Sequence, residues 1–281
     1  MPRLTSAEKV RPAFSRVSAS SKPIPEATTS LAALLASAGF PASGEVFQGS
    51  AGFFQIFYQQ EGDYDALLDQ LGSRFEIVLV GPKPFPSCRY THCAVTACVN
   101  LLRSHSIKGP DVQEIRVQIG ERDMRSVGGW TEDEKKKKRR PEGVVDAQFS
   151  IPYTVAAALV NGGLSLEEFT DAKLRNEEIL DLAARVKLIL NRDLDKGPMD
   201  VKPQVVEVVT RDGKIISERI EFPKGNPNNP VTSDELVDSF RGMAAYAAKP
   251  LSGAQVDDAI SLALRLDQIP DVSVLTKLLT H

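Results

Sequence analysis

The spacing of apolar residues predicts helices near both ends of the chain. The run "SLAALLASAGF" carries leucines at helical spacing and ends at Gly39, and "DYDALLDQLG" predicts a second short helix that stops at Gly72. Thr232 and Glu235 have the spacing of a capping box at the start of "TSDELVDSFRGMAAYAA". We expect two more short helices after that one.

The middle of the chain mixes the two periodicities. Residues 75–80 are apolar and predict a strand, and residues 95–102 place Val, Cys, Val and Leu on one face of a helix. "KGPD" ends that helix, and alternating apolar residues over 112–119 predict a second strand. Residues 75–119 are therefore expected to form a strand–loop–helix–strand unit.

Further elements are expected beyond this unit. Residues 131–143 carry many charges and few apolar anchors, which predicts a mobile loop. A short helix is expected after Pro152, and "NEEILDLAARVKLIL" predicts a long amphipathic helix after a Ser165–Glu168 capping box. Two β-rich runs flank Asp212-Gly213, a pair that favours a hairpin with a type I′ turn. This order of elements indicates an α+β fold.

Composition limits the class of protein. The 281 residues are 42% hydrophobic and 25% charged with a net charge of −3, so we expect a globular protein with no general attraction to nucleic acid or to an anionic membrane. The sequence has no apolar run near the ~20 residues that a membrane-spanning helix needs. Cys88, Cys93 and Cys98 fit no common zinc motif or disulfide framework, which favours reduced thiols. Residues 1–29 are rich in Ser, Pro, Ala and Thr, which predicts a disordered tail; a mitochondrial presequence is the alternative.

The stretch "GPKPFPSCRYTH" gathers the most candidate chemistry. Ser87 and Cys88 precede a predicted helix, whose N-terminus favours anions, and Lys83 and Arg89 add full positive charges. We expect His92 about one turn into that helix, where the dipole lowers the pKa and favours a neutral imidazole. The stretch is suited to bind a polyanion and to move a proton beside it. An ordinary turn with solvated charges, and a packed thiol at Cys88, are the alternatives.

Two other segments are less decisive. Tyr153 begins a predicted helix, where its hydroxyl would donate to an anion or, alternatively, lie satisfied at the edge of the core. The basic run "KKKKRR" at residues 135–140 is typical of a solvated loop, and a nuclear-localisation patch is the alternative.

Four segments resemble the MmgE/PrpD family, which includes 2-methylcitrate dehydratase and cis-aconitate decarboxylase. They are "SLAALLASAGF", "KPFPSCRYTH", "AQFSIPYTVAAALVNGG" and "KGNPNNPVTSDEL". The resemblance implies the C-terminal part of the family fold, namely part of an all-helical domain (residues 30–72 and 232–281) and a smaller α+β lid with a mixed sheet (residues 73–231). It also implies a homodimer or a partner chain, a small tricarboxylate substrate, and neither an organic cofactor nor a metal.

The resemblance also assigns roles to single residues. Lys83 matches a lysine that lines the family's active site, His92 matches a histidine, and Tyr153 is similar to an active-site tyrosine. Ser87, Cys88 and Arg89 are expected to contact substrate carboxylates. Cys88 stands where the decarboxylase branch carries a histidine, which favours the dehydratase branch.

The expected function follows from this resemblance. It is a lyase that eliminates water from 2-methylcitrate or a longer 2-alkylcitrate, with Lys83, His92 and Tyr153 as catalytic residues. A cis-aconitate decarboxylase-like enzyme and a non-catalytic protein that binds a partner are the alternatives. Because nothing here resembles the family's N-terminal helical half, we expect weak activity from the chain alone. The expected location is cytoplasmic or mitochondrial.

Overall fold

The computed structural model describes residues 26–41, 43–59, 62–196 and 201–280, and the chain divides into two compact units at Phe75/Glu76. The predicted tail falls almost wholly outside the described residues. Unit 1 contains α1 (Glu26–Ser37), α2 (Phe53–Tyr58) and α3 (Tyr64–Leu68). The two predicted helices are confirmed, and the chain leaves α1 through Gly39 in the left-handed conformation (φ 85°). The domain boundaries that the resemblance implies remain a prediction.

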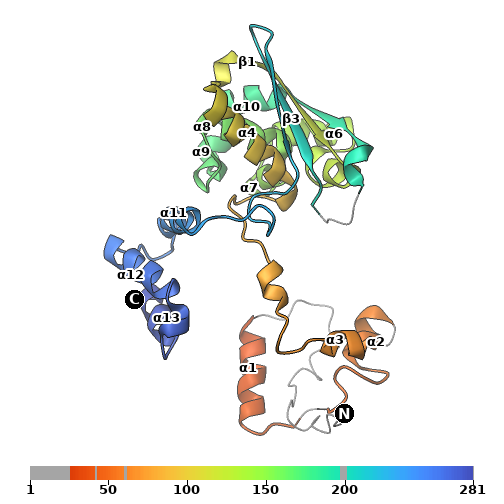
Figure 1. The fold of residues 1–281 in the computed structure, drawn as a ribbon, viewed down its shortest axis with the longest axis vertical. Helices are drawn as coiled ribbons and strands as arrows, with labels where there is room; N and C mark the ends of the chain where they lie inside the picture. Colours follow the sequence, from red (N-terminus) through yellow and green to blue (C-terminus); the bar gives the residue numbers. More distant parts are fainter. Residues whose placement is uncertain (1–25, 42, 60–61, 197–200, 281) are drawn as a thin grey trace. The chain divides into compact units, whose positions relative to one another are not determined.

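Unit 2 is an α+β structure around one four-stranded mixed sheet (Figure 1). The strands are β1 (Val112–Ile119), β2 (Val186–Leu190), β3 (Gln204–Thr210) and β4 (Ile215–Ile220), in the order β2-β1-β3-β4. β1 pairs in parallel with β2 and antiparallel with β3, which pairs antiparallel with β4. The fold class expected from the sequence is confirmed.

The α-helices of unit 2 lie before, between and after the strands in the sequence. They are α4 (His92–His105), α5 (Glu121–Asp123), α6 (Glu132–Arg139), α7 (Val144–Gln148), α8 (Ile151–Asn161), α9 (Asp171–Leu174), α10 (Glu177–Ala184), α11 (Ser233–Ala244), α12 (Gly253–Ala263) and α13 (Ser273–Thr280). α4 packs on β3 and β4 and also contacts α8, which packs against α10 (Figure 1).

The core lies between this helical layer and the inner face of the sheet. The inward residues of β1 are fully buried, and they alternate with polar residues that face outward, such as Glu114 and Arg116. On the outer face Arg116 pairs with Glu114 at 2.6 Å and with Glu207 at 3.7 Å. One face of the sheet is therefore apolar and buried, and the other is charged.

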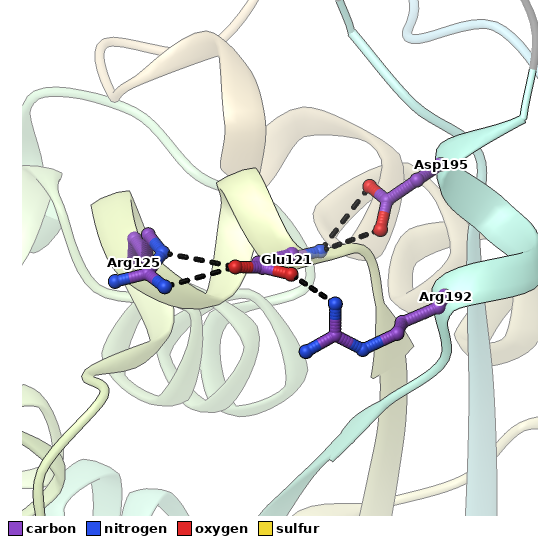
Figure 2. Close-up of polar contacts among 4 residues, drawn as sticks. All are labelled: Glu121, Arg125, Arg192 and Asp195. Atoms are coloured by element: carbon purple, nitrogen blue, oxygen red, sulfur yellow. Dashed lines mark hydrogen bonds and ion pairs between the residues drawn. The ribbon is translucent and has the colours of Figure 1, made fainter.

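A charged cluster joins the ends of the parallel strands β1 and β2 (Figure 2). The carboxylate of Asp195, after β2, accepts the backbone N–H of Glu121 at 3.0 and 3.2 Å, and so caps α5. The carboxylate of Glu121 accepts hydrogen bonds from Arg125 at 2.9 Å and from Arg192. These hydrogen bonds, first that of Arg125, hold the pKa of Glu121 below its usual value. The cluster fixes the chain where β1 ends.

The predicted strand at residues 75–80 is wrong. Residues Glu76–Leu79 form a 3₁₀ turn, and the apolar side chains are exposed, with Ile77 at 74%. The sheet is completed by β1–β4, and no described strand pairs with this run. A short apolar run forms a strand only where a neighbouring strand pairs with it, and residues 75–80 have no such neighbour among the described strands. Of the predicted strand–loop–helix–strand unit, only the loop, the helix and the second strand are therefore found.

Three other expectations are corrected. The charged segment 131–143 contains helix α6 rather than a loop, because the Thr131 hydroxyl accepts the backbone N–H of Glu134 while the Glu134 carboxylate accepts the backbone N–H of Thr131.

The long helix expected over 176–190 ends at Ala184, and its β-branched remainder forms β2. The Asp-Gly hairpin is confirmed, but only Gly213 has a positive φ (85°), so its three-residue loop is not a type I′ turn.

Candidate functional site

A cleft of about 830 Å³ lies beside the segment "KPFPSC". One wall is Lys83–Cys88 with Gln148, the last residue of α7, and Phe149, which follows it. The opposite wall is the loop Leu164–Leu166, the second half of α11 from Asp238, and the residues Ala245 and Tyr246 that follow α11. The cleft thus joins four segments that are far apart in the sequence, all within unit 2.

Lys83 is the cationic residue of this cleft. Its side chain is exposed, and it has no hydrogen bond or ion pair with any residue that the structure describes. Pro82, Pro84 and Pro86 surround it, and each fixes its own φ angle, which restricts the loop. Lys83 therefore presents an unneutralised ammonium group from a stiff loop.

Arg89 binds the backbone of the loop that carries Lys83. Its guanidinium donates to the carbonyl oxygens of Gly81 at 3.2 Å and Pro82 at 3.4 Å, and it does not line the cleft. The structure therefore brings Lys83, Ser87 and Cys88 together on one wall, with Arg89 bound to the backbone beside them. Two adjacent positive charges meeting in the cleft were expected, and only that of Lys83 is found there.

The helix N-terminus is satisfied by the protein itself. A 3₁₀ turn at Arg89–Thr91 precedes α4, the Ser87 N–H donates to Phe85 O at 2.9 Å, and the Cys88 N–H donates to Gln148 O at 2.9 Å. Deeper in the first turn, the Ala94 N–H donates to the side chain of Gln204 at 2.8 Å. These amides were expected to face an anion, but they are used in internal hydrogen bonds.

His92 is the first residue of α4 rather than one turn inside it, and it is fully buried. Its Nε2 lies 3.4 Å from Ser87 O, its ring meets Phe85 edge-on with centroids 5.3 Å apart, and its Nδ1 has no hydrogen-bond partner among the described residues. Burial is the main reason that its pKa falls from 6.5 to about 4, and the charges of Arg89 and Lys83 act in the same direction. The imidazole is therefore neutral at pH 7, behind Phe85 and Ser87 of the cleft wall.

Tyr153 lies elsewhere, in the core of unit 2. It is fully buried near the start of α8, and its hydroxyl donates to the carbonyl oxygen of Glu168 at 2.5 Å. Burial, with the nearby charge of Glu168, raises its pKa. Tyr153 is not among the residues that line the cleft. The sequence had suggested that Lys83 and Tyr153 would share a site, and of the two only Lys83 lines this cleft.

The three cysteines differ in environment. Cys88 is half-buried and lines the cleft, whereas Cys93 and Cys98 are buried in α4, and all three are free thiols. Burial raises the pKa of Cys93 to about 12 and raises that of Cys98 further. Only Cys88 combines a free thiol with access to the cleft.

The wall formed by α11 was not anticipated from the sequence. It contributes Asp238, Ser239 and Met243. Tyr246, just after α11, also lines the cleft, and its hydroxyl donates to the Glu167 carboxylate at 2.9 Å. That hydrogen bond ties the chain just after α11 to Glu167, which directly follows the loop Leu164–Leu166 of the same wall. The amphipathic pattern of α11 predicted a helix, but nothing in the pattern indicated what its apolar face would meet.

Membrane-spanning helices and metal sites are absent from the part of the chain that the structure describes. No helix among them combines the length and the apolar character needed to cross a bilayer. Within the same described ranges, no group of three or more His, Cys, Asp or Glu side chains is arranged to hold a metal ion.

Comparison with known proteins relates the chain to one family. Residues 85–266 match the model of the MmgE/PrpD C-terminal domain. The chain is 26% identical to human cis-aconitate decarboxylase over 255 residues, which cover 88% of this chain and 50% of the relative. It is 24% identical to the cis-aconitate decarboxylase-like protein oryM of Aspergillus oryzae over 259 residues, 88% of this chain and 52% of that protein.

A third relative matches over a shorter segment. Mouse cis-aconitate decarboxylase is 27% identical over 140 residues, which are 50% of this chain and 28% of that protein. The chain thus spans about half the length of the human and fungal relatives. The matched domain contains the sheet, α4–α11 and most of the cleft wall, although Lys83 precedes its first residue. The match over residues 85–266 establishes that the chain belongs to the MmgE/PrpD family.

Proposed function

We propose that the cleft binds the carboxylate of a citrate-like substrate through Lys83 and serves a lyase reaction. The observation that carries this proposal is the unpaired ammonium group of Lys83 on the wall of a cleft of about 830 Å³. A carboxylate that leaves water loses hydration free energy unless a fixed positive group replaces the solvent. Family membership directs the proposal to small carboxylic acids.

The reaction we favour is elimination of water from 2-methylcitrate or a 2-alkylcitrate. A base removes a proton beside a carboxylate, a carbon–carbon double bond forms, and the tertiary hydroxyl leaves as water with a second proton. The positive charge of Lys83 stabilises the negative charge that develops on the carboxylate. His92, neutral at pH 7, is the proposed proton acceptor; because its ring lies behind Phe85, this role requires the Lys83–Cys88 wall to move.

Decarboxylation is the second candidate. It is favoured by the similarity of the chain to the human and mouse cis-aconitate decarboxylases. In that reaction the same Lys83 holds one carboxylate while another leaves as carbon dioxide and a proton replaces it. Cys88, a residue that the family resemblance associates with dehydratases, favours the first reaction.

Charge balance supports a second protein surface at the site. The lining carries one positive residue, Lys83, and one negative residue, Asp238, so its net charge is zero, whereas a citrate-like substrate carries about three negative charges near pH 7. We therefore propose that another copy of the chain or a partner chain supplies further cations. A chain that only binds such a partner, without catalysis, is the non-enzymatic alternative.

Separate incubations with 2-methylcitrate and cis-aconitate distinguish these candidates. Proton NMR detects the vinyl or alkyl signals of an elimination product, and released carbon dioxide reports decarboxylation. We expect slow elimination from 2-methylcitrate that the Lys83→Met variant loses. Carbon dioxide released from cis-aconitate would favour the second candidate. Equal product with Lys83→Met would contradict the role of Lys83 in either reaction.

A further inference from the structure

The walls of the cleft are more apolar than a small tricarboxylate requires. Beyond Lys83, the lining is dominated by Phe85, Phe149, Leu166, Met243 and Tyr246. Phe149, Met243 and Tyr246 remain 43%, 50% and 49% exposed, although aromatic and thioether side chains gain free energy when they leave water. A concave surface lined by large, half-exposed apolar side chains is typical of a ligand site.

Polar side chains on these walls are largely committed to the protein. Gln148 donates to Pro86 O at 2.8 Å, and the Ser87 hydroxyl pairs with Thr91 at 2.8 Å. The hydroxyls of Ser165 and Tyr246 bind the carboxylates of Glu168 at 2.8 Å and Glu167 at 2.9 Å. These groups offer little to the several oxygens of a small, fully polar acid, so most of the lining interacts better with hydrocarbon.

The size of the cleft supports the same conclusion. About 830 Å³ lies within the range of roughly 300–1,000 Å³ that is typical of pockets for drug-sized ligands. The unpaired cation, Lys83, lies on one wall, and Met243 of α11 lies on the opposite wall. The arrangement suits a molecule with a carboxylate at one end and an apolar chain at the other.

We propose that the cleft selects carboxylates that bear a hydrocarbon substituent of several carbons, with the carboxylate at Lys83 and the chain against Phe149, Leu166 and Met243. This inference rests on the proposed function, because it assigns the substrate class of the same cleft. Long 2-alkylcitrates fit it better than 2-methylcitrate. Asp238 strengthens the preference, because it repels a second carboxylate from the α11 wall.

The test uses methyl-, butyl- and octylsuccinate as probes, titrated into the full chain by calorimetry. Burial of one methylene contributes about fourfold in affinity, so butylsuccinate should bind roughly 50-fold more tightly than methylsuccinate. Octanol, which has the chain but no carboxylate, should bind much more weakly than octylsuccinate. Equal affinity for the three succinates would overturn the inference and leave the role of Lys83 intact.

Variants on one helix provide a matched comparison. Met243 lines the cleft, whereas Leu236 of the same helix, 46% exposed, does not. Met243→Gln should reduce the gain from methyl- to octylsuccinate several-fold, and Leu236→Gln should leave it unchanged, with similar melting temperatures for both variants. Equal losses in the two variants would overturn the inference. Failure of every succinate to bind, or affinities that Lys83→Met does not change, would contradict the proposed function as well.

Discussion

Gly81 and Gly225 cross backbone to backbone, with no room for a side chain on either residue. A Cβ on Gly81 would overlap the carbonyl oxygen of Gly225, and a Cβ on Gly225 would overlap that of Pro82. Gly225 has a φ of 87° and belongs to a tight turn in which its N–H donates to Asn229 O at 2.8 Å. The turn in "KGNPNNP" therefore supports the loop that carries Lys83.

Replacing Gly225 with alanine tests this support. Gly225→Ala combines an unfavourable positive φ with a backbone collision, whereas Gly213→Ala has a similar φ of 85° and no neighbour within 4 Å. We expect Gly213→Ala to lower the free energy of unfolding by about 1 kcal/mol, and Gly225→Ala to lower it by more and to weaken carboxylate binding as well. Urea unfolding and calorimetry measure the two effects. Equal losses of stability would show that the crossing is not tightly packed.

The buried His92 predicts a pH dependence of stability. Its pKa is about 4 in the folded chain and 6.5 in the reference state, so the unfolded chain binds more protons between these values. The contribution of neutral His92 is complete above about pH 6.5 and is lost as the pH falls towards 4, by roughly 3 kcal/mol in total. Urea unfolding at several pH values gives the free energy of unfolding of the wild type and of His92→Asn. The difference between the two free energies, followed from pH 7 to pH 4, should isolate this loss.

The exposed His105 provides the control for that experiment. His105→Asn removes an exposed imidazole from the end of α4 and leaves the buried His92 in place, so its change of stability between pH 4 and 7 should follow that of the wild type. If His92→Asn kept the wild-type slope over this range, the buried, neutral state of His92 would be refuted.

The three thiols should react at very different rates. Cys88 lines the cleft, while burial protects Cys93 and Cys98 and keeps both protonated at pH 8. Iodoacetamide followed by peptide mass spectrometry should find one modified cysteine, at Cys88, in the native chain and three after denaturation. Octylsuccinate in the cleft should slow the modification. Labelling of Cys93 at the rate of Cys88 would contradict this placement.

Gln204 joins α4 to β3 in the core. Its amide accepts from Ala94 N at 2.8 Å and donates to Tyr90 O at 2.6 Å and to the Asp123 carboxylate at 2.7 Å. Gln204→Leu removes three hydrogen bonds inside the core and should cost about 3 kcal/mol of unfolding free energy. Gln118→Leu on β1, which loses one hydrogen bond to Asn191, should cost about 1 kcal/mol. Similar costs would argue that the Gln204 contacts contribute little.

Sequence periodicity predicted the elements that local signals define. The Thr232–Glu235 capping box, the helix predicted from residues 95–102, and the Asp-Gly hairpin are all present. Periodicity failed at residues 75–80 and 186–190, where the same apolar character suits a strand, a turn or a helix, and only a neighbouring strand decides. β2 pairs with β1, whereas residues 75–80 have no such neighbour.

The site was predictable to a smaller extent. Lys83, Ser87 and Cys88 were identified from one short stretch of the sequence. The structure places all three on one wall of the cleft. The α11 wall and the Gln204 cap depend on contacts across more than 70 residues, which no local pattern specifies. The sequence suggested that Tyr153 shares a site with Lys83, but the hydroxyl of Tyr153 donates a hydrogen bond to the carbonyl oxygen of Glu168 in the core. Long-range packing thus determines which polar groups remain available to a ligand.

The most direct measurement is the affinity of the full chain for tricarballylate, a tricarboxylate without a hydroxyl group to eliminate. Lys83→Met removes the unpaired charge of the cleft, and Lys249→Met removes another exposed lysine, one that does not line it. We predict that calorimetry will show at least tenfold weaker binding with Lys83→Met, and no change with Lys249→Met, at equal melting temperatures. Unchanged affinity in Lys83→Met, or an equal loss in both variants, would contradict carboxylate binding at Lys83.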